Sequence, residues 1–479
     1  MDIELFDISK CFDKLWLKEC LNDLYEAGLS SSNLNLLYEG NKECFLSVKI
    51  SGSKTNRILL KDLVMQGSVW GPLSCTSSMD KIGQRSYKTG SPLYTYKGLV
   101  SIPPLGMIDD EITMAECGSK STLTNVYMNN FTESKRLTFG IKKCKKMHIG
   151  KETLVCDDIK VHDKQGEKVT NEKYIGDVIS SDGSNSKTLK ERIDKGYGIV
   201  SEIISILEEV PLGNYKIIAG IKLREAMLLN GILFNSEVWY GLTEDDIEKL
   251  SYVDEYLLRS ILKAPSKTPK ETLYLETGCK PIKYIIKKRR LMYLHHILRR
   301  PKDEVIRKFY SAQKLKPSRN DWVLSIEKDK TELNIKLSDE EIAQYKKYKF
   351  KKYLEEKIRN ETFKYLIKKK ETHSKASNLT NDEKYFLFKL RTRMINLKPN
   401  FKNKYTDLKC QLGCGEEEHQ KHLLECKILL NECDQLGLNA KIEYEDIFND
   451  KARQNKAAKL LYLAWKTRQN LIDEYQQDC

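Results

Sequence analysis

The sequence has no uninterrupted apolar run near the ~18 residues of a membrane span, which excludes an integral membrane protein with spanning helices. Its first residues, Met1 to Glu4, have neither the basic nor the apolar region of a secretory signal. The 13 cysteines are spread between Cys11 and Cys479 without a dense framework. This spacing excludes a disulfide scaffold and predicts free thiols in a reducing compartment, nuclear or cytoplasmic. We find no internal repeat.

Positive charge is in excess and is clustered. The 479 residues include 82 Lys and Arg against 68 Asp and Glu, a formal net charge of +14. Residues 341–370 hold ten Lys and one Arg against four Glu, with six aromatic residues among them, and residues 280–302 hold nine basic residues and no acid. Cations interspersed with rings suit a nucleic acid whose bases stack. Lysine-rich helix faces that simply remain solvated are the alternative.

The hydrophobic pattern changes near residue 187. Before it, residues 3–7 alternate as a strand, residues 12–24 have helical spacing, and residues 45–50 and 58–64 predict strands around a turn. Residues 107–108 and 112–115 flank an acidic tip and predict a tight hairpin. After it, apolar stripes predict helices over 187–210 and 216–240. Further helices are predicted after Thr243, and after a capping box at Thr268 with its stop at Gly278. We expect an α+β fold.

Two acidic sites are embedded in apolar strand sequence. The first contains Asp7 and Asp13, and the second is Asp109-Asp110 at the predicted hairpin tip. Carboxylates on neighbouring strands hold Mg²⁺ ions in two-metal sites, whereas isolated acids cap helices or lie in solvated turns. The segment 65–72 between them has two glycines that allow close backbone approach. The order of these three segments favours the metal-binding interpretation.

These segments resemble the motifs of reverse transcriptases, in the style of non-LTR (LINE-like) retrotransposon enzymes. The similar segments are residues 7–13 (DISKCFD) for motif A, 66–72 (QGSVWGP) for motif B, 108–110 (IDD) for motif C, 140–147 (GIKKCKKM) for motif D and 173–179 (KYIGDVI) for motif E. The resemblance implies a right-hand polymerase palm, with a ferredoxin-like antiparallel sheet and packed helices, followed by a helical thumb. It implies RNA-directed DNA polymerase activity with an RNA template, a DNA primer and dNTPs.

The resemblance also implies roles for single residues. Asp7, Asp109 and Asp110 would form the site for two Mg²⁺ (or Mn²⁺) ions. Lys143 would lie near the leaving pyrophosphate, with Lys142 and Lys145 as alternatives. Phe12 would stack under the sugar and exclude a 2′-hydroxyl, and Gln66 and Gly67 would shape the nucleotide and template pocket. The chemistry would be in-line attack of a primer 3′-oxygen on an α-phosphate.

The sequence departs from the family pattern at several positions. Cys11, Met65, Trp70 and Ile108 replace the usual Ala, Pro, Leu and Ala, and no fingers motifs precede Asp7. We therefore expect an N-terminally truncated chain whose own activity is open. The alternatives are a non-catalytic RNA- or DNA-binding remnant and a basic structural protein with fortuitous motifs. No Pro-Asp…Asp/Glu-x-Lys pattern follows Cys426, so we expect no endonuclease.

A metal site is predicted near the C-terminus. Cys410, Cys414, His422 and Cys426 have the pattern Cys-x3-Cys-x7-His-x3-Cys, which suits a tetrahedral Zn²⁺ site, with His419 as a weaker substitute for His422. The pattern resembles the CCHC knuckle of endonuclease-bearing non-LTR retroelement proteins. The expected domains are a palm (1–180), a helical thumb and connector (181–330), a basic helical nucleic-acid-binding segment (331–405), the knuckle (406–430) and a helical tail (431–479).

Two further motifs have weaker interpretations. His295 and His296 are adjacent, and adjacent residues diverge on a helix, so we do not expect a metal pair. Lys287 to Arg290 suit a nuclear import signal or a nucleic-acid-binding helix face.

Overall fold

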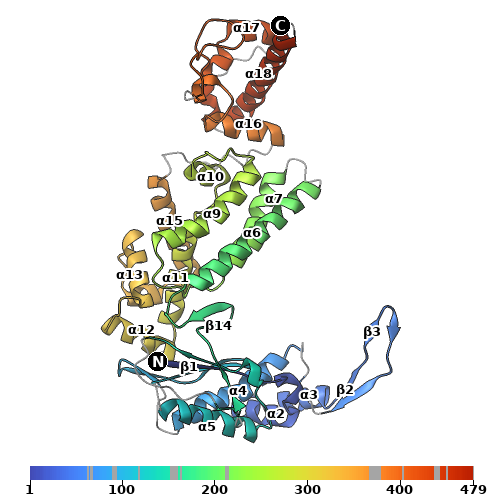
Figure 1. The fold of residues 1–479 in the computed structure, drawn as a ribbon, viewed down its shortest axis with the longest axis vertical. Helices are drawn as coiled ribbons and strands as arrows, with labels where there is room; N and C mark the ends of the chain where they lie inside the picture. Colours follow the sequence, from blue (N-terminus) through green and yellow to red (C-terminus); the bar gives the residue numbers. More distant parts are fainter. Residues whose placement is uncertain are drawn as a thin grey trace. The chain divides into compact units, whose positions relative to one another are not determined.

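The computed structural model describes two compact units of the chain. It describes residues 1–61, 64, 68–88, 94–116, 119–150, 160–161, 164–210, 215–365, 379–401, 404–435, 443–448 and 451–477. Unit 1 comprises Met1–Thr188 and Ile297–Leu324, and unit 2 comprises Leu189–His296 and Ser325–Cys479. The fold is α+β, as the sequence predicts (Figure 1). No described helix is both long and apolar enough to cross a bilayer. The five predicted domains and the boundaries between them stay a prediction.

Unit 1 is built on a five-stranded sheet with the order β13-β10-β1-β9-β8. The central strand β1 pairs antiparallel with both β9 and β10. β13 alone adds in parallel, beside β10. The strands of the unit are β1 (Asp2–Asp7), β2 (Glu43–Leu46), β3 (Lys49–Ile50), β4 (Ser53–Lys54), β5 (Ile58–Lys61), β6 (Tyr94–Tyr96), β7 (Val100–Ile102), β8 (Leu105–Met107), β9 (Asp110–Ala115), β10 (Lys145–His148), β11 (Lys160–Val161), β12 (Lys164–Gln165), β13 (Glu167–Lys168), β14 (Asn171–Tyr174) and β15 (Asp177–Ser180).

Successive side chains of β1 point to opposite faces of the sheet, and the two faces are covered by different elements. Phe6 belongs to a core that includes Met79 of α4 and Phe131 of α5, so helices pack on its face (Figure 1). Ile3 and Leu5 contact the β14–β15 hairpin on the opposite face. The helices of the unit are α1 (Cys11–Lys14), α2 (Leu17–Glu26), α3 (Ser31–Asn41), α4 (Gly71–Lys88), α5 (Ser119–Ser134), the 3₁₀ turn η1 (Ile141–Lys143) and α12 (Val305–Leu315).

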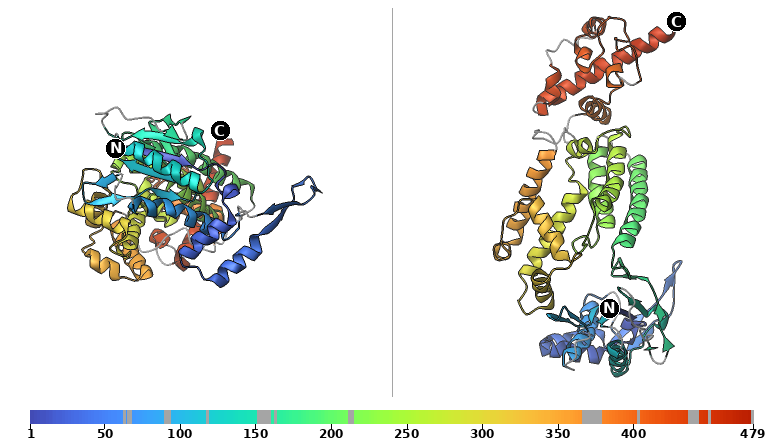
Figure 2. Two further views of the ribbon diagram at one scale, coloured as in Figure 1. Left: turned by 90° about the horizontal axis from the view of Figure 1, so that it is seen from below. Right: turned by 60° about the vertical axis from the view of Figure 1, so that its left-hand side comes forward.

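A two-stranded arm projects from the helices of unit 1 (Figure 2, left). It consists of the β2–β5 pair, continued by the β3–β4 pair at its tip. Gly52, with φ of 91°, lies at the turn. Strands form within both predicted segments, 45–50 and 58–64, but the turn is shorter than the predicted 51–54, because Ser53 and Lys54 form β4. Phe45 and Ile50 are 61% and 68% exposed, so the arm presents apolar side chains to solvent.

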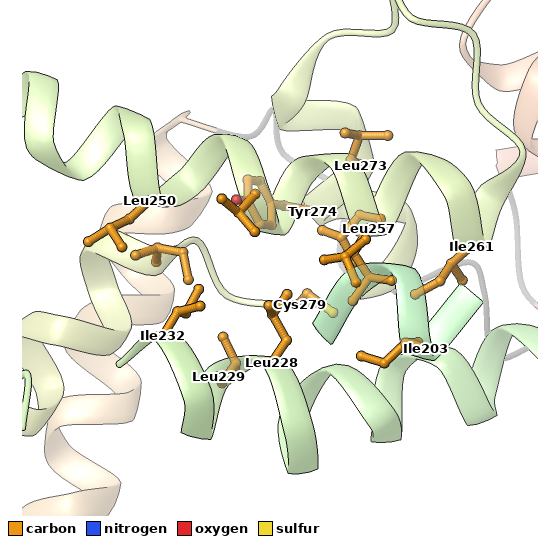
Figure 3. Packing of buried hydrophobic residues seen from close by; sticks show 14 of the residues in the cluster. Ile203, Leu228, Leu229, Ile232, Leu250, Leu257, Ile261, Leu273, Tyr274 and Cys279 are labelled. Carbon is orange, nitrogen blue, oxygen red and sulfur yellow. The ribbon is translucent and has the colours of Figure 1, made fainter. Parts of the chain in front are cut away.

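Unit 2 is helical and has a large apolar core, part of which Figure 3 shows. Ile203, Leu228, Leu257 and Leu273 meet there from four helices. The helical segments of the unit, with short ends shared with unit 1, are α6 (Ser186–Glu209), α7 (Lys216–Leu223), the π-helical turn η3 (Arg224–Leu228), α8 (Leu229–Ile232), α9 (Glu244–Leu262), α10 (Lys270–Thr277), α11 (Ile282–Leu298), α13 (Trp322–Glu332), α14 (Asp339–Gln344), α15 (Lys347–Tyr365), α16 (Asn381–Arg391), η5 (Lys398–Phe401), η6 (Gln420–Leu424), α17 (Lys427–Gln435), η7 (Tyr444–Phe448) and α18 (Lys451–Gln477).

Two helix predictions need correction. The helix expected over 216–240 ends at Ile232 and contains the π-helical turn. This turn carries Arg224, whose buried guanidinium pairs with Asp254 (Nε to Oδ1, 2.5 Å), a contact that no local pattern encodes. The capping box expected at Thr268 is absent, because α10 begins after Pro269 without a side-chain cap. The box at Thr243 does form, with Asp246 as its partner, and Gly278 ends α10 with φ of 67°.

Candidate functional site

The first candidate site lies at the end of β1 in unit 1. Asp7 is the last residue of this strand and lies opposite Asp110, the first residue of β9. Directly opposed residues of an antiparallel pair project from the same face of the sheet, with Cβ atoms ~4.5–5.5 Å apart. The two acids from the first and third motifs therefore share one face, although 102 intervening residues separate them in the sequence.

A tight hairpin carries the other aspartate. Met107 of β8 pairs with Asp110 of β9, which leaves Ile108 and Asp109 as the turn. The hairpin predicted from the sequence is thereby confirmed. Ile108 has φ of 66°, a left-handed conformation that β-branched residues rarely adopt. The backbone N–H of Ile8 donates to the carbonyl of Asp109 (3.4 Å), which ties the turn to the end of β1.

Lys143 compensates part of the negative charge at this site. Its Nζ lies 3.0 Å from Oδ1 of Asp7, and this contact raises the pKa of Lys143. Burial raises the pKa of Asp110, the charges of Asp109 and Asp7 raise it further, and Lys143 lowers it. Lys145, one of the two alternatives to Lys143, pairs with Glu167 instead. The short turn η1 thus brings Lys143 to the aspartates.

The three aspartates are close without forming a complete ligand group. Among the described residues, the group of three or more His, Cys, Asp or Glu side chains that could hold a metal lies in unit 2. The ammonium of Lys143 bonds to Asp7, so a cation that uses this carboxylate must displace it. The electrostatic repulsion that raises the pKa of Asp110 is what such a cation would relieve. The magnesium site stays a prediction.

Residues from three motifs border one apolar cluster. Phe12, Trp70 and Ile108 are partly buried, and each packs against the core that contains Phe6. Phe12 thus packs on the helix-covered face of the sheet, and its role under a sugar stays a prediction. Gln66 and Gly67 lie outside the described residues. The structure resumes at Ser68, whose hydroxyl accepts from the N–H of Gly71 (3.0 Å) at the start of α4.

Glu111 is a buried acid beside the site that the sequence analysis missed. It is 2% exposed and lies opposite Gly106, where any Cβ would overlap its carboxyl group. Burial raises the pKa of Glu111 to about 8, and the charges of Asp110 and Asp80 add to this shift. The sequence does show Glu111 as the third consecutive acid after Ile108. Its pairing opposite Phe6 of β1 is what directs its side chain toward the helices.

The raised pKa of Glu111 predicts a pH-dependent stability. The folded chain retains this proton between the ordinary value of 4.5 and about 8, so its free energy of unfolding falls as pH rises through that window. We expect Glu111→Gln, in the presence of a chelator, to remove this decline and to be more stable than wild type at pH 8 by roughly 3–5 kcal/mol. Urea unfolding at several pH values measures it, with the exposed Glu39→Gln as the control. Equal pH slopes for both variants would contradict the prediction.

The second candidate site is a Cys/His cluster in unit 2. One ligand atom each from Cys410, Cys414, His422 and Cys426 lies within 4.8 Å of the others. The two sulfurs of Cys410 and Cys426 are 4.0 Å apart, and Cys414 Sγ is 3.2 Å from Nε2 of His422. Tetrahedral zinc with bonds of ~2.0–2.3 Å separates its ligand atoms by roughly 3.5–4 Å. The donor set and spacing fit Zn²⁺.

Local backbone geometry brings these four residues together. Gly413 and Gly415 have φ of 83° and 88°, which turn the chain between the first two cysteines and the histidine. His419 caps η6, and its Nδ1 accepts from the N–H of His422 (3.1 Å). This bond explains why His422 belongs to the cluster and His419 does not. Cys426 follows at the start of α17.

Burial shifts the pKa values of His422 and Cys410 in opposite senses for metal binding. Burial lowers the pKa of His422, which favours the neutral imidazole that metals require. Burial, opposed in part by a backbone hydrogen bond from Leu412, raises the pKa of the Cys410 thiol to about 12. Forming the Cys410 thiolate without a cation is therefore unfavourable, and zinc binding must release the thiol proton.

A buried ion pair holds the cluster against α18. Arg468 and Glu418 are each 1% exposed, and the guanidinium Nε donates to Oε1 of Glu418 (2.9 Å). Its Nη2 donates to the side chain of Gln411 (2.6 Å). Both partners of Arg468 lie in the loop that carries the metal-ligand candidates, so α18 stabilises this loop from outside the ligand shell.

The two basic segments differ in what they expose. On α15, Phe350, Leu354 and Ile358 are buried, and basic residues are exposed at Lys347, Lys349, Lys351, Lys352 and Arg359. On α11, Lys287 and Arg290 are 5% and 4% exposed, and Arg290 pairs with Asp329 (2.7 Å). The run 287–290 is thus not a continuous exposed cationic surface.

The adjacent histidines do not form a metal pair. His295 is buried, and its Nε2 donates to the carbonyl of Tyr345 (2.9 Å). His296 is exposed.

No family model matches the chain, and no curated protein matches it.

Proposed function

We propose that this chain is an RNA-directed DNA polymerase of the non-LTR retrotransposon type, which adds nucleotides to a primer 3′-hydroxyl at Asp7, Asp109 and Asp110. In this proposal the sheet of unit 1 is the palm, the helices of unit 2 supply the thumb and connector, and residues 406–430 are a zinc knuckle. RNA and DNA are its macromolecular partners and dNTPs its substrates. One observation carries the proposal: Asp7 and Asp110 are cross-strand partners beside a hairpin tip that holds Asp109.

Each residue near the site has a definable part in this reaction. Bound there, Mg²⁺ would neutralise charge on the α-phosphate and favour deprotonation of the primer hydroxyl. Asp7 and Asp110 project from one face of the sheet and would hold the cations. Lys143 is 72% exposed on a flexible side chain, so its ammonium would move from Asp7 to an oxygen of the leaving pyrophosphate. Phe12 packs against the core that contains Phe6 and would limit the space under the sugar.

A second function, non-catalytic binding of RNA or DNA, is favoured by a different observation. The Cys/His cluster is assembled, whereas Asp7 is paired to Lys143 and the aspartates do not form a ligand group. The exposed lysines of α15 would bind phosphates in either case.

Primer extension separates the two functions. The purified chain is incubated with a DNA-primed RNA template, dNTPs and Mg²⁺, with chelator as the blank. Extension that needs both Mg²⁺ and the RNA template supports the polymerase. Salt-dependent binding of the same primed template without any extension supports the second function and overturns the first.

Gly140 offers a test of how the site is positioned. A Cβ at Gly140 would lie 2.7 Å from Oδ2 of Asp7, so Gly140→Ala must push this carboxylate aside. We expect primer extension to fall by roughly 10-fold or more, because small misplacements of reacting groups are costly. Gly40→Ala is the matched control, since its Cβ meets nothing within 4 Å. Equal rates for the two variants would show that the position of Asp7 is unimportant.

A further inference from the structure

Unit 2 contains a cavity that neither the aspartate site nor the Cys/His cluster uses. It has a volume of about 360 Å³ and is lined by α16, the segment after it, α18 and the end of α9. This volume is within the ~300–1,000 Å³ of small-ligand pockets. No zinc-ligand candidate lines it.

Aromatic rings form the wall of the cavity. The ring of Phe386 lies 5.4 Å from that of Tyr462 and 6.1 Å from that of Trp465, measured between centroids. Phe386 is 5% exposed, whereas Tyr462 and Trp465 are half-buried and line the cavity. Lys466 Nζ lies 4.9 Å from the centroid of the Tyr462 ring and Arg468 Cζ 4.9 Å from that of the Trp465 ring, so a cation lies over one face of each ring. Aromatic side chains that line a cavity suit a planar ligand that stacks.

Polar groups at the rim indicate the charge of that ligand. Lys263 is exposed, with its Nζ 4.8 Å from the centroid of the Tyr385 ring, and Lys389 is half-buried. Asp382 is the acid among the lining residues, so cations outnumber anions there. Asn396 is exposed, and its amide both donates and accepts hydrogen bonds, as the edge of a nucleobase requires.

We propose that this cavity binds one unpaired nucleotide of a single-stranded nucleic acid. The base stacks on Tyr462 and Trp465, and the flanking phosphates bind Lys263 and Lys389. A paired base has no free face or edge for such a site, so the cavity discriminates against duplex. The choice of a nucleic acid as the ligand rests on the proposed function, but binding in the cavity does not need polymerase activity. A methylated lysine would also suit the rings, but the two rim lysines repel it.

The test uses the full chain and an oligodeoxythymidine of about eight nucleotides, a usual length for stacking proteins. One thymine is replaced by 5-bromouracil, and the cross-linked peptide is identified by mass spectrometry. We expect crosslinks at Tyr462 or Trp465, which duplex of the same sequence does not compete away. Overall binding cannot locate the site, because the lysines of α15 also attract the oligonucleotide. The position of the crosslink locates it.

Variants measure the contribution of the rim. The double variant Lys263→Gln, Lys389→Gln is expected to reduce crosslinking at the pocket about tenfold and to lower the salt dependence of pocket binding by ~1.4 in log–log slope, since each single-strand contact contributes ~0.7. Lys459→Gln, an exposed lysine on α18, is the matched control. Crosslinks that map elsewhere, or equal labelling in the double variant and the control, overturn the proposal. The proposal is also overturned if a trimethyllysine peptide occupies the pocket and the oligonucleotide does not bind there.

The same measurement keeps the two proposals apart. Asp109→Asn should crosslink like wild type, because Asp109 belongs to unit 1 and does not line the cavity. Pocket crosslinks from a chain that never extends a primer would contradict the polymerase alone. Primer extension without pocket crosslinks would contradict the nucleotide pocket alone.

Discussion

Replacement of Asp109 by asparagine is expected to reduce RNA-templated primer extension by roughly 10²–10⁴-fold. Asparagine has the shape of aspartate but lacks the charge that holds a divalent cation. The fold should survive, since the contact that ties the hairpin tip to β1 uses the backbone carbonyl of Asp109 and not its side chain. Asp7→Asn should have a comparable effect, because Asp7 faces Asp110 directly across the sheet.

The control for this experiment is a matched aspartate elsewhere in unit 1. Asp303 is exposed and lies just before α12, outside the strands that carry the aspartates. Asp303→Asn should extend primers at the wild-type rate. Should Asp109→Asn and Asp303→Asn be equally active, the assignment of the catalytic acids would be wrong.

Replacement of Cys426 by serine, or removal of metal with a chelator, is expected to unfold the Cys/His loop. Cys426 is 1% exposed, and a structural zinc ion supplies ~10–16 kcal/mol to domains of this kind. Without the ion, the four side chains of the cluster contact one another only through weak thiol hydrogen bonds, and the loop depends on its packing and on the Arg468 ion pair. We therefore expect fast backbone hydrogen exchange over residues 404–435 and loss of one zinc per chain, with the sheet of unit 1 unchanged.

Cys44→Ser is the matched control for the zinc experiment. Cys44 lies in unit 1 on β2, and the contact of its thiol is with the carbonyl of Asn41 (3.9 Å). This variant should retain zinc and slow exchange throughout the loop. A wild-type chain that holds no zinc when prepared under reduction, with exchange over 404–435 equal to that of Cys426→Ser, would contradict the metal site.

Features set by neighbours in the sequence were predictable. The hairpin around Asp109 follows from alternation on both sides of a short polar tip, and the Cys/His cluster follows from spacing within 17 residues. The choice of His422 over His419 was less certain, because the orientation of one 3₁₀ turn decides it. The selection of Lys143 over Lys145 has the same origin in η1.

Features set by distant partners were not predictable. The sequence places Arg290 in a basic run, which predicts that it is exposed. Its burial depends on the ion pair with Asp329, 39 residues away. In the sequence, Glu111 is the third of three consecutive acids at the hairpin tip. The burial of its carboxyl group follows only from the strand register that places it opposite Gly106. The approach of Gly140 to the Asp7 carboxylate likewise depends on residues 133 positions apart in the chain.

The proposed polymerase requires Asp7, Asp109 and Asp110 to share divalent cations. Crystals of the chain with a primed RNA template, an incoming dNTP and Mn²⁺ would test it through the anomalous scattering of manganese. We expect manganese between the carboxylate of Asp7 and those of the β8–β9 hairpin, with Lys143 moved from Asp7 to the triphosphate. A bound dNTP with no manganese at these carboxylates, and with Lys143 still paired to Asp7, would contradict it.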